Sequence, residues 1–204
     1  MQNTSRGRVR RLGGIVTAAI LVIFGIVAVV MGLDGRSAVH SALKQQGVVG
    51  LPHMTPTAIT ASAKEAGLQD VELPTCSVAA TAVDDGAAAR CFAQYMRIDA
   101  LMATDGRTYA QMPRFATPDG RGTNDPARAQ KSPDGRPVEN PARGVWVTAT
   151  ALSNALNMSY MGERIALFGV AVGAAFLLVG LAFAVFATGG ARIPPRLRRG
   201  QGRA

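Results

Sequence analysis

Two long stretches of the chain contain no charged residue. They run from Leu12 to Leu33 and from Ile165 to Ala191. A bilayer core of ~30 Å requires about 20 apolar residues in a helix that rises about 1.5 Å per residue. The pattern therefore predicts transmembrane helices over residues 12–33 and 163–191. The alternative for each stretch is a buried core helix, but uncharged runs of this length are unusual in a chain of 204 residues.

The first stretch also has to be compared with a cleaved signal peptide, because four arginines precede it. The apolar core of a signal peptide usually spans about 7–15 residues, fewer than this stretch contains. The segment Val39-His40-Ser41 is a poor cleavage site. We therefore expect the first span to be an uncleaved anchor.

Small residues repeat along one face of each predicted span. At about 100° per residue, the members of each set lie within about 60° of one another. Small residues let two helix backbones approach closely in lipid. We expect the two spans to pack on each other through these faces; the alternative is that one face contacts another subunit. The residues are Gly14, Ala18, Gly25 and Gly32 in the first span, and Gly169, Gly173, Gly180 and Ala184 in the second.

Between the spans, segments with helical spacing alternate with turn residues. The pattern predicts a short helix over residues 36–46, a second from Thr55-Pro56 to Ala66, and a third over residues 87–102. Residues 70–73 alternate between polar and apolar side chains, which favours a short strand. The uninterrupted run over residues 147–161 predicts a helix that continues into the second span.

One face of the helix predicted over residues 87–102 is apolar. Cys91, Tyr95, Ile98 and Met102 fall on it at helical spacing. Such a face either packs into a core or lines a binding groove. We expect it to be a core face.

The chain has two cysteines, Cys76 and Cys91, and both lie between the spans. A cysteine pair outside the membrane is typical of a disulfide. Such a bond would close a loop of about 15 residues and stabilise the fold by about 3 kcal/mol in the chain-entropy model. The alternative is two buried free thiols.

Residues 113–143 are rich in Pro, Gly, Arg and Asp, and they contain a duplicated unit. Residues 117–128 (TPDGRGTNDPAR) match residues 132–143 (SPDGRPVENPAR) at an offset of 15 positions. Each unit opens with Pro-Asp-Gly, a turn sequence, and closes with Asp-Pro or Asn-Pro, which favours the start of a helical turn. We expect a turn-rich insert, either ordered only by its neighbours or used to bind a partner.

The net charge of +9 is confined to the two ends of the chain. Residues 1–11 hold four arginines and residues 192–204 hold five, and neither segment has an acid. Because positive charge beside a span stays on the cytoplasmic side, both tails are expected to be cytoplasmic, against anionic lipid headgroups. Residues 34–162 are then extracytoplasmic. The basic charge is thus a topology signal, and no nucleic-acid partner is expected.

Residues that carry chemistry are sparse. The only histidines are His40 and His53, and a metal site would need both of them together with an acid such as Glu65 or Asp70. There is no nucleophile motif and no phosphate-binding glycine loop. Neither span has in its interior the acids, bases, Asn or Gln that ion and proton paths use. We therefore expect no catalytic residue, no metal site and no cofactor.

The segment 91–112 (CFAQYMRIDALMATDGRTYAQM), together with residues 150–161 leading into the second span, resembles an uncharacterised family of actinobacterial membrane proteins. The resemblance covers most of the chain outside residues 113–143. It implies a two-span architecture and no established activity. Members are sometimes labelled aromatic ring-opening dioxygenases, whose chemistry needs iron ligands. His40 and His53 alone do not supply such a set, so no functional residue is carried over.

The sequence thus predicts a mainly α protein of the plasma membrane: a hairpin of two transmembrane helices with a small, mostly helical extracytoplasmic domain between them. The first function hypothesis is a non-catalytic accessory or scaffold subunit of a membrane assembly. Its partners would be other membrane proteins or a second copy of the chain. The alternative is an extracytoplasmic module that binds or senses a ligand, and an enzyme ranks last.

Overall fold

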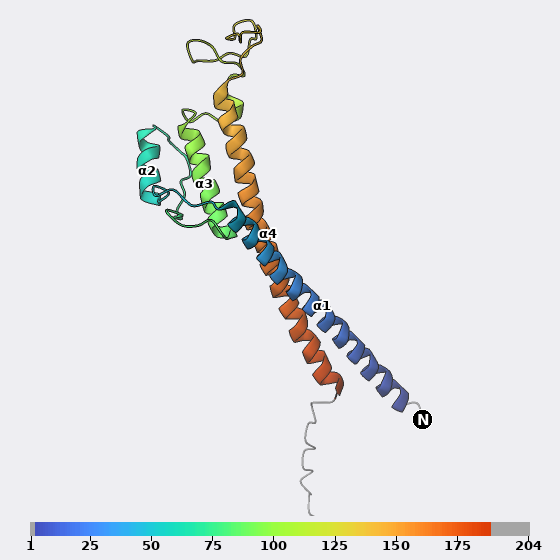
Figure 1. Cartoon of the computed structure of the whole chain (residues 1–204). Helices are drawn as coiled ribbons and strands as arrows, with labels where there is room; N and C mark the ends of the chain where they lie inside the picture. The colour runs from blue at the N-terminus through green and yellow to red at the C-terminus, as the bar shows by residue number, and fades with distance from the viewer. Residues whose placement is uncertain (1–2, 189–204) are drawn as a thin grey trace, which may run out of the picture. The chain divides into compact units, whose positions relative to one another are not determined.

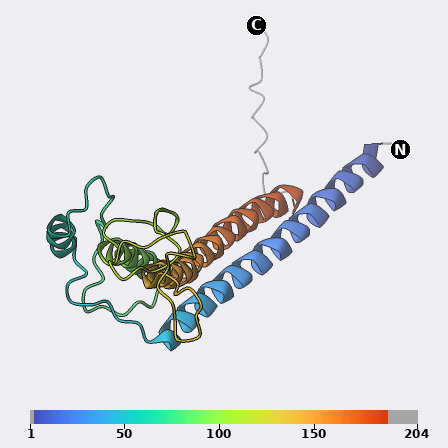
Figure 2. The ribbon, with the colours of Figure 1, turned by 90° about the horizontal axis from the view of Figure 1, so that it is seen from above.

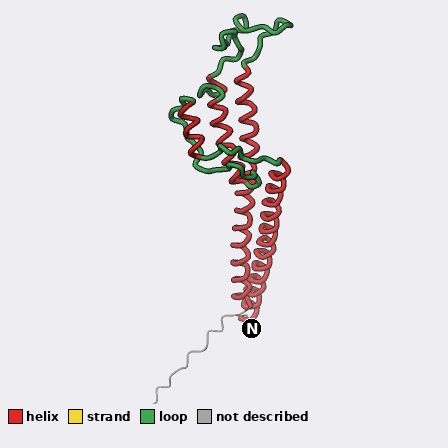
Figure 3. The backbone as a smooth tube through the Cα atoms, turned by 60° about the vertical axis from the view of Figure 1, so that its left-hand side comes forward, coloured by secondary structure: helices red, strands yellow, loops and turns green. Residues whose placement is uncertain are grey.

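The computed structural model describes residues 3–188, and within that range the chain is mainly α-helical with no β-strand. The predicted tail 192–204 and the last three residues of the predicted span 163–191 lie outside this range. The described residues form four α-helices, which are joined by loops (Figures 1 and 3). These are α1 (Asn3–Gln46), α2 (Pro56–Glu65), α3 (Gly86–Met102) and α4 (Pro141–Thr188), with a 3-10 helix η1 (Tyr109–Gln111) between α3 and α4.

The chain divides into two compact units, and α1 and α4 each belong to both. The described part of the first unit comprises residues 3–34 and 166–188, and the second unit is Gly35–Ile165. Residues 36–46 are helical and the helix ends at Gln46, as predicted, but they do not form a separate helix, because α1 runs through Asp34-Gly35 without a break. A glycine inside a helix costs only about 1 kcal/mol, whereas ending and restarting the helix requires a new nucleus.

The first unit consists of two apolar helical segments, seen side by side in Figure 2. Both α1 and α4 are long and apolar enough to cross a membrane, and only 11% of the most apolar window of each is buried. Large side chains such as Phe24 and Phe168 are exposed by 63% and 69%. A core helix of a water-soluble protein would be mostly buried, so this exposure favours membrane spans over the alternative.

The second unit has a hydrophobic core in which α2 packs against α3. Tyr95 lies at its centre, is fully buried, and donates a hydrogen bond of 2.7 Å from its hydroxyl to the carbonyl oxygen of Cys76. A disulfide joins Cys76 to Cys91, one turn before Tyr95 on α3. The buried core residues are Met54, Ile59, Ala63, Val78, Cys91, Tyr95, Ile98 and Leu101.

Polar caps define the two short helices of this unit. Thr55 caps α2 by accepting a bond of 3.2 Å from the Ala58 amide, and Asp85 caps α3 by accepting one of 2.7 Å from the Ala88 amide. The predictions for both helices are therefore confirmed to within a residue or two. The strand predicted over residues 70–73 is wrong: no neighbouring strand pairs with it, and Asp70 has a positive φ of 55°.

Candidate functional site

Small residues of α1 face small residues of α4 in the first unit. A Cβ atom built on Gly25 would lie 2.8 Å from the carbonyl oxygen of Gly173, and one built on Gly173 would lie 2.7 Å from the carbonyl oxygen of Gly25. At Gly32 the same atom would lie 2.6 Å from the carbonyl oxygen of Ala166. The backbones can approach this closely only because these positions lack a side chain.

The same contact surface extends toward the termini of the two helices. A Cβ atom on Gly14 would lie 3.0 Å from the Cβ atom of Ala187. Ala18 is 4% exposed, and its carbonyl oxygen is 3.2 Å from the position of a Cβ atom on Gly180. We call this surface the glycine seam; it comprises Gly14, Ala18, Gly25 and Gly32 of α1 with Gly173 and Gly180 of α4.

The other two small residues of α4 make looser contacts. A Cβ atom on Gly169 would have ordinary contacts, 3.7 Å from the carbonyl oxygen of Ala28. Ala184 is half-buried. Gly13, by contrast, has nothing within 4 Å of a built Cβ atom, so it lies off the seam. The tightest part of the seam therefore involves Gly25, Gly32 and Gly173.

A largely buried carboxylate joins three helices in the second unit. Glu163 of α4, with its side chain 11% exposed, accepts hydrogen bonds from Arg36 Nε at 3.0 Å and from His40 Nε2 at 3.1 Å, both on α1. Its second oxygen accepts the backbone N–H of Gly86, the first residue of α3, at 2.7 Å. The N–H groups at a helix start have no partner within the helix, so this carboxylate acts as a cap from outside it.

Gly86 is required at this contact. A Cβ atom there would lie 2.7 Å from Glu163 Oε2 and 2.8 Å from the Cα atom of Tyr160. Glycine thus lets the start of α3 approach α4 closely enough for the 2.7 Å bond. We call the group of Arg36, His40, Gly86 and Glu163 the carboxylate cluster.

The two histidines lie with different carboxylates. His40 belongs to the carboxylate cluster, whereas the charge of His53 acts on Asp99 of α3. Burial raises the pKa of Asp99, and His53 offsets part of that shift. Over residues 3–188, no three His, Cys, Asp or Glu side chains are grouped so that they could hold a metal ion. The structure thus does not bring His40 and His53 to one site.

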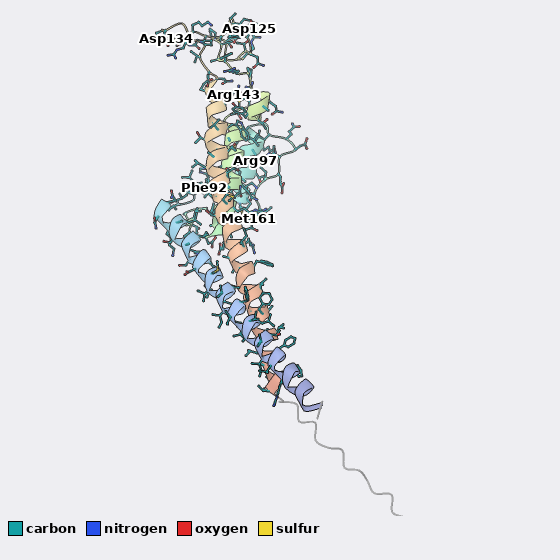
Figure 4. All side chains as sticks on the ribbon, turned by 90° about the vertical axis from the view of Figure 1, so that its right-hand side faces the viewer. Phe92, Arg97, Asp125, Asp134, Arg143 and Met161 are labelled. Atoms are coloured by element: carbon teal, nitrogen blue, oxygen red, sulfur yellow. A yellow bond between two sulfur atoms is a disulfide. The ribbon has the colours of Figure 1, made fainter. Side chains whose placement is uncertain are left out.

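The apolar face of α3 is a core face, as expected. Cys91, Tyr95 and Ile98 are each no more than 5% exposed and belong to the core, and Met102 packs against it. A neighbouring face of the same helix, with Phe92 (labelled in Figure 4), lines an apolar groove of about 550 Å³.

Each copy of the duplicated unit folds into the same turn. In the first copy, Thr117 Oγ1 and Arg121 Nε donate to the two carboxylate oxygens of Asp119 at 2.5 and 2.7 Å. These bonds lower the pKa of Asp119 to about 2. A glycine with positive φ follows the aspartate in both copies. The equivalent residues of the second copy, which make the same contacts, are Ser132, Asp134 and Arg136.

The closing parts of the two copies are also alike. The carboxylate of Asp125 accepts the N–H of Ala127 at 2.8 Å, and the amide oxygen of Asn140 accepts the N–H of Ala142 at 3.1 Å. The first cap is followed by a single turn, whereas the second starts α4 at Pro141. The duplicated sequence therefore supplies the N-cap of α4.

Backbone hydrogen bonds hold the insert together. Phe115, only 8% exposed, exchanges two bonds of 2.9 Å with Thr123. The N–H of Ala116 donates to the carbonyl oxygen of Val138, also at 2.9 Å. The insert therefore has hydrogen bonds of its own, which do not fit the alternative that only its neighbours order it. Figure 4 shows it as a folded excursion, with Asp125 and Asp134 at its far end and Arg143 where it joins α4.

Comparisons with other proteins add nothing to this geometry: no family model matches the chain, and no curated protein or solved structure is similar to it. Sequence reasoning selected the small residues and the two cysteines, but it missed the carboxylate cluster. Its contacts join residues 77 to 127 positions apart, and no local pattern links such positions.

Proposed function

We propose that this chain is a non-catalytic scaffold or accessory subunit of an assembly in the plasma membrane. Its two apolar helices form a transmembrane hairpin with both termini in the cytoplasm. The arginines of the tails 1–11 and 192–204 support this orientation, since positive charge is retained on the cytoplasmic side. The glycine seam supports the hairpin, because it pairs successive positions of α1 with progressively earlier positions of α4.

The disulfide supports an extracytoplasmic location for residues 34–162. Disulfides persist in oxidising compartments and are rare in the cytoplasm. The bond between Cys76 and Cys91 ties α3 to the loop before it, and Tyr95 donates to the same loop. The outer domain is therefore fixed by a bond that its compartment preserves.

The observation that supports the scaffold function is the ordered structure of the insert before α4 begins. We call this part, residues 113–140, the excursion. Its turns are closed by its own side chains, and its two ends are paired through Phe115 and Glu139. A partner that binds such a segment does not have to order it first, so more of the contact energy remains for affinity. Long ordered loops of this kind are often functional in compact domains. We assign this surface to a protein partner outside the cytoplasm.

The test replaces the excursion while keeping its base. Because Ala116 donates to the carbonyl oxygen of Val138, residues 117–137 can be exchanged for Asn-Gly, which closes a two-residue hairpin turn between them. The replaced and parent proteins are purified in mild detergent with a tag, and co-purifying proteins are quantified.

We expect a stoichiometric partner with the parent protein and its loss with the replacement, while the melting temperature of the outer domain is retained. A control that alters an exposed lysine outside the excursion, Lys64 of α2 to Gln, should keep the partner. A parent protein that purifies alone, or a partner that survives the replacement, would contradict the proposal.

A further inference from the structure

A cavity lined by two arginines lies at the base of the excursion. Its volume is about 590 Å³, and its walls come from η1, from the two ends of the excursion and from the first turns of α4. The polar residues that line it are Tyr109, Arg114, Glu139, Asn140, Arg143 and Thr148.

Arg143 has an unmet hydrogen-bonding group in this wall. Its guanidinium carbon lies 4.0 Å from the ring centroid of Tyr109, so the ring holds the side chain in place. Its Nε atom is buried, and among the described residues it has no hydrogen-bond partner. A buried donor without a partner is unfavourable, and a bound acceptor is one way to satisfy it.

Arg114 is held in a similar way, with its guanidinium carbon 5.1 Å from the centroid of Phe115. Across residues 3–188, no carboxylate lies within 4.0 Å of the charged nitrogens of Arg114 or Arg143, whereas the exposed Arg121 is paired with Asp119 in its turn. Glu139 also lines the cavity but is not ion-paired to either arginine. Two positive charges against one negative charge leave the cavity with a positive excess.

We propose that this cavity binds a small organic anion through its phosphate or carboxylate group, with Arg114 and Arg143 donating to the anionic oxygens. A guanidinium offers paired N–H donors in the geometry that such oxyanions accept. A volume of 590 Å³ lies in the range of small-molecule pockets, about 300–1,000 Å³, and exceeds what a bare oxyanion would fill. The remaining space accommodates a group such as a sugar.

Side chains, rather than the start of α4, supply the donors of this site. Pro141 has no N–H, and the amides of Ala142 and Arg143 already donate to Asn140. The proposal goes beyond the scaffold function and does not depend on it, since ligand binding and partner binding are measured separately.

The duplication provides a matched control. Arg128 occupies in the first copy the position that Arg143 occupies in the second, and its N–H donates to Asp125 as that of Arg143 donates to Asn140. Arg128 is exposed and does not line the cavity. Replacing it removes the same charge from the same local structure without touching the proposed site.

The experiment follows the fluorescence of Trp146, the only tryptophan, in the full-length protein in detergent. Trp146 lies three residues after Arg143 on α4 and is half-buried. Glucose 6-phosphate, glucuronate and neutral glucose are titrated in parallel. We expect a saturable change with an anion and none with glucose, and the stronger of the two anions identifies the preferred group.

Arg143→Gln and Arg114→Gln should each weaken binding roughly tenfold to hundredfold, the value of a charge-assisted hydrogen bond. Arg128→Gln should leave it unchanged, and Glu139→Gln should strengthen it. Arg143→Lys keeps the positive charge and is tested in place of Arg143→Gln if that variant fails to fold. Absence of saturation with both anions, equal binding by glucose, or equal loss in Arg128→Gln would overturn the proposal.

Discussion

The glycine seam makes a prediction that can be worked out from its distances. In Gly25→Ala and Gly173→Ala, the new methyl group would lie 2.8 or 2.7 Å from a backbone oxygen of the opposite helix, at least 0.6 Å short of the 3.4 Å at which ordinary contacts begin. Backbone cannot move aside as a flexible side chain can, so α1 and α4 must separate. Overpacking of this size costs about 1–3 kcal/mol.

The matched control is Gly13→Ala on the same helix, where a built Cβ atom meets nothing within 4 Å. There we expect no loss, and at most a gain of about 0.5–1 kcal/mol from the lower flexibility of alanine. Gly25→Ala combined with Gly173→Ala should cost less than the sum of the two, because one separation of the helices relieves both contacts.

The assay measures the distance between spin labels on Ile20 and Leu178, which are 49% and 69% exposed. Both native cysteines are in the disulfide, so cysteines introduced for labelling are the free thiols among the described residues. SDS is added to the protein in dodecyl maltoside, and the fraction that keeps the short distance gives the free energy of separation. If both seam variants behave like Gly13→Ala, the spans do not pack through the seam.

Three further predictions concern the second unit. Glu163→Ala removes the acceptor for three hydrogen-bond donors and should lower the free energy of unfolding by about 2–4 kcal/mol. Unfolding is followed by tryptophan fluorescence, and Glu163→Gln should cause a smaller loss. Replacing Cys76 and Cys91 by Ser should cost about 3 kcal/mol, and dithiothreitol should destabilise the parent but not this variant. By carbon NMR, Asp119 should titrate near pH 2, and Thr117→Ala should move its pKa up toward 3.8. Since the folded pKa is the lower one, its stabilising contribution is present above pH 3.8 and disappears as the pH falls to about 2.

The helices of this chain could be predicted where a local pattern was sufficient. Thr55-Pro56 marked the start of α2 because a side-chain cap and a proline act within a few residues of each other. The uncharged runs marked the apolar parts of α1 and α4 for the same reason. A break in the helix at Asp34-Gly35 was predicted but is absent, since turn residues can also be carried inside a long helix.

The candidate sites could likewise be predicted only where they depend on a local sequence pattern. The small residues Gly25 and Gly173 were found because their spacing on one helix is a local property. Glu163 is only the first residue of the predicted span 163–191 in the sequence, and its contact with Gly86 depends on how α3 approaches α4. The cavity around Arg143 was missed for the same reason, although the repeat that contains this residue was visible.

The backbone pairing at the base of the excursion allows the length of the excursion to change without a change in the rest of the fold. Phe115 forms an antiparallel bridge with both Thr123 and Glu139, so the chain leaves and returns beside the same residue. Each copy of the duplicated sequence forms its own closed turn. A change in the number of copies would therefore lengthen or shorten the excursion while its first and last residues keep their places. We therefore expect length polymorphism among homologous chains to occur in steps of about 15 residues at this point, and the same point to accept an inserted epitope tag without loss of the fold.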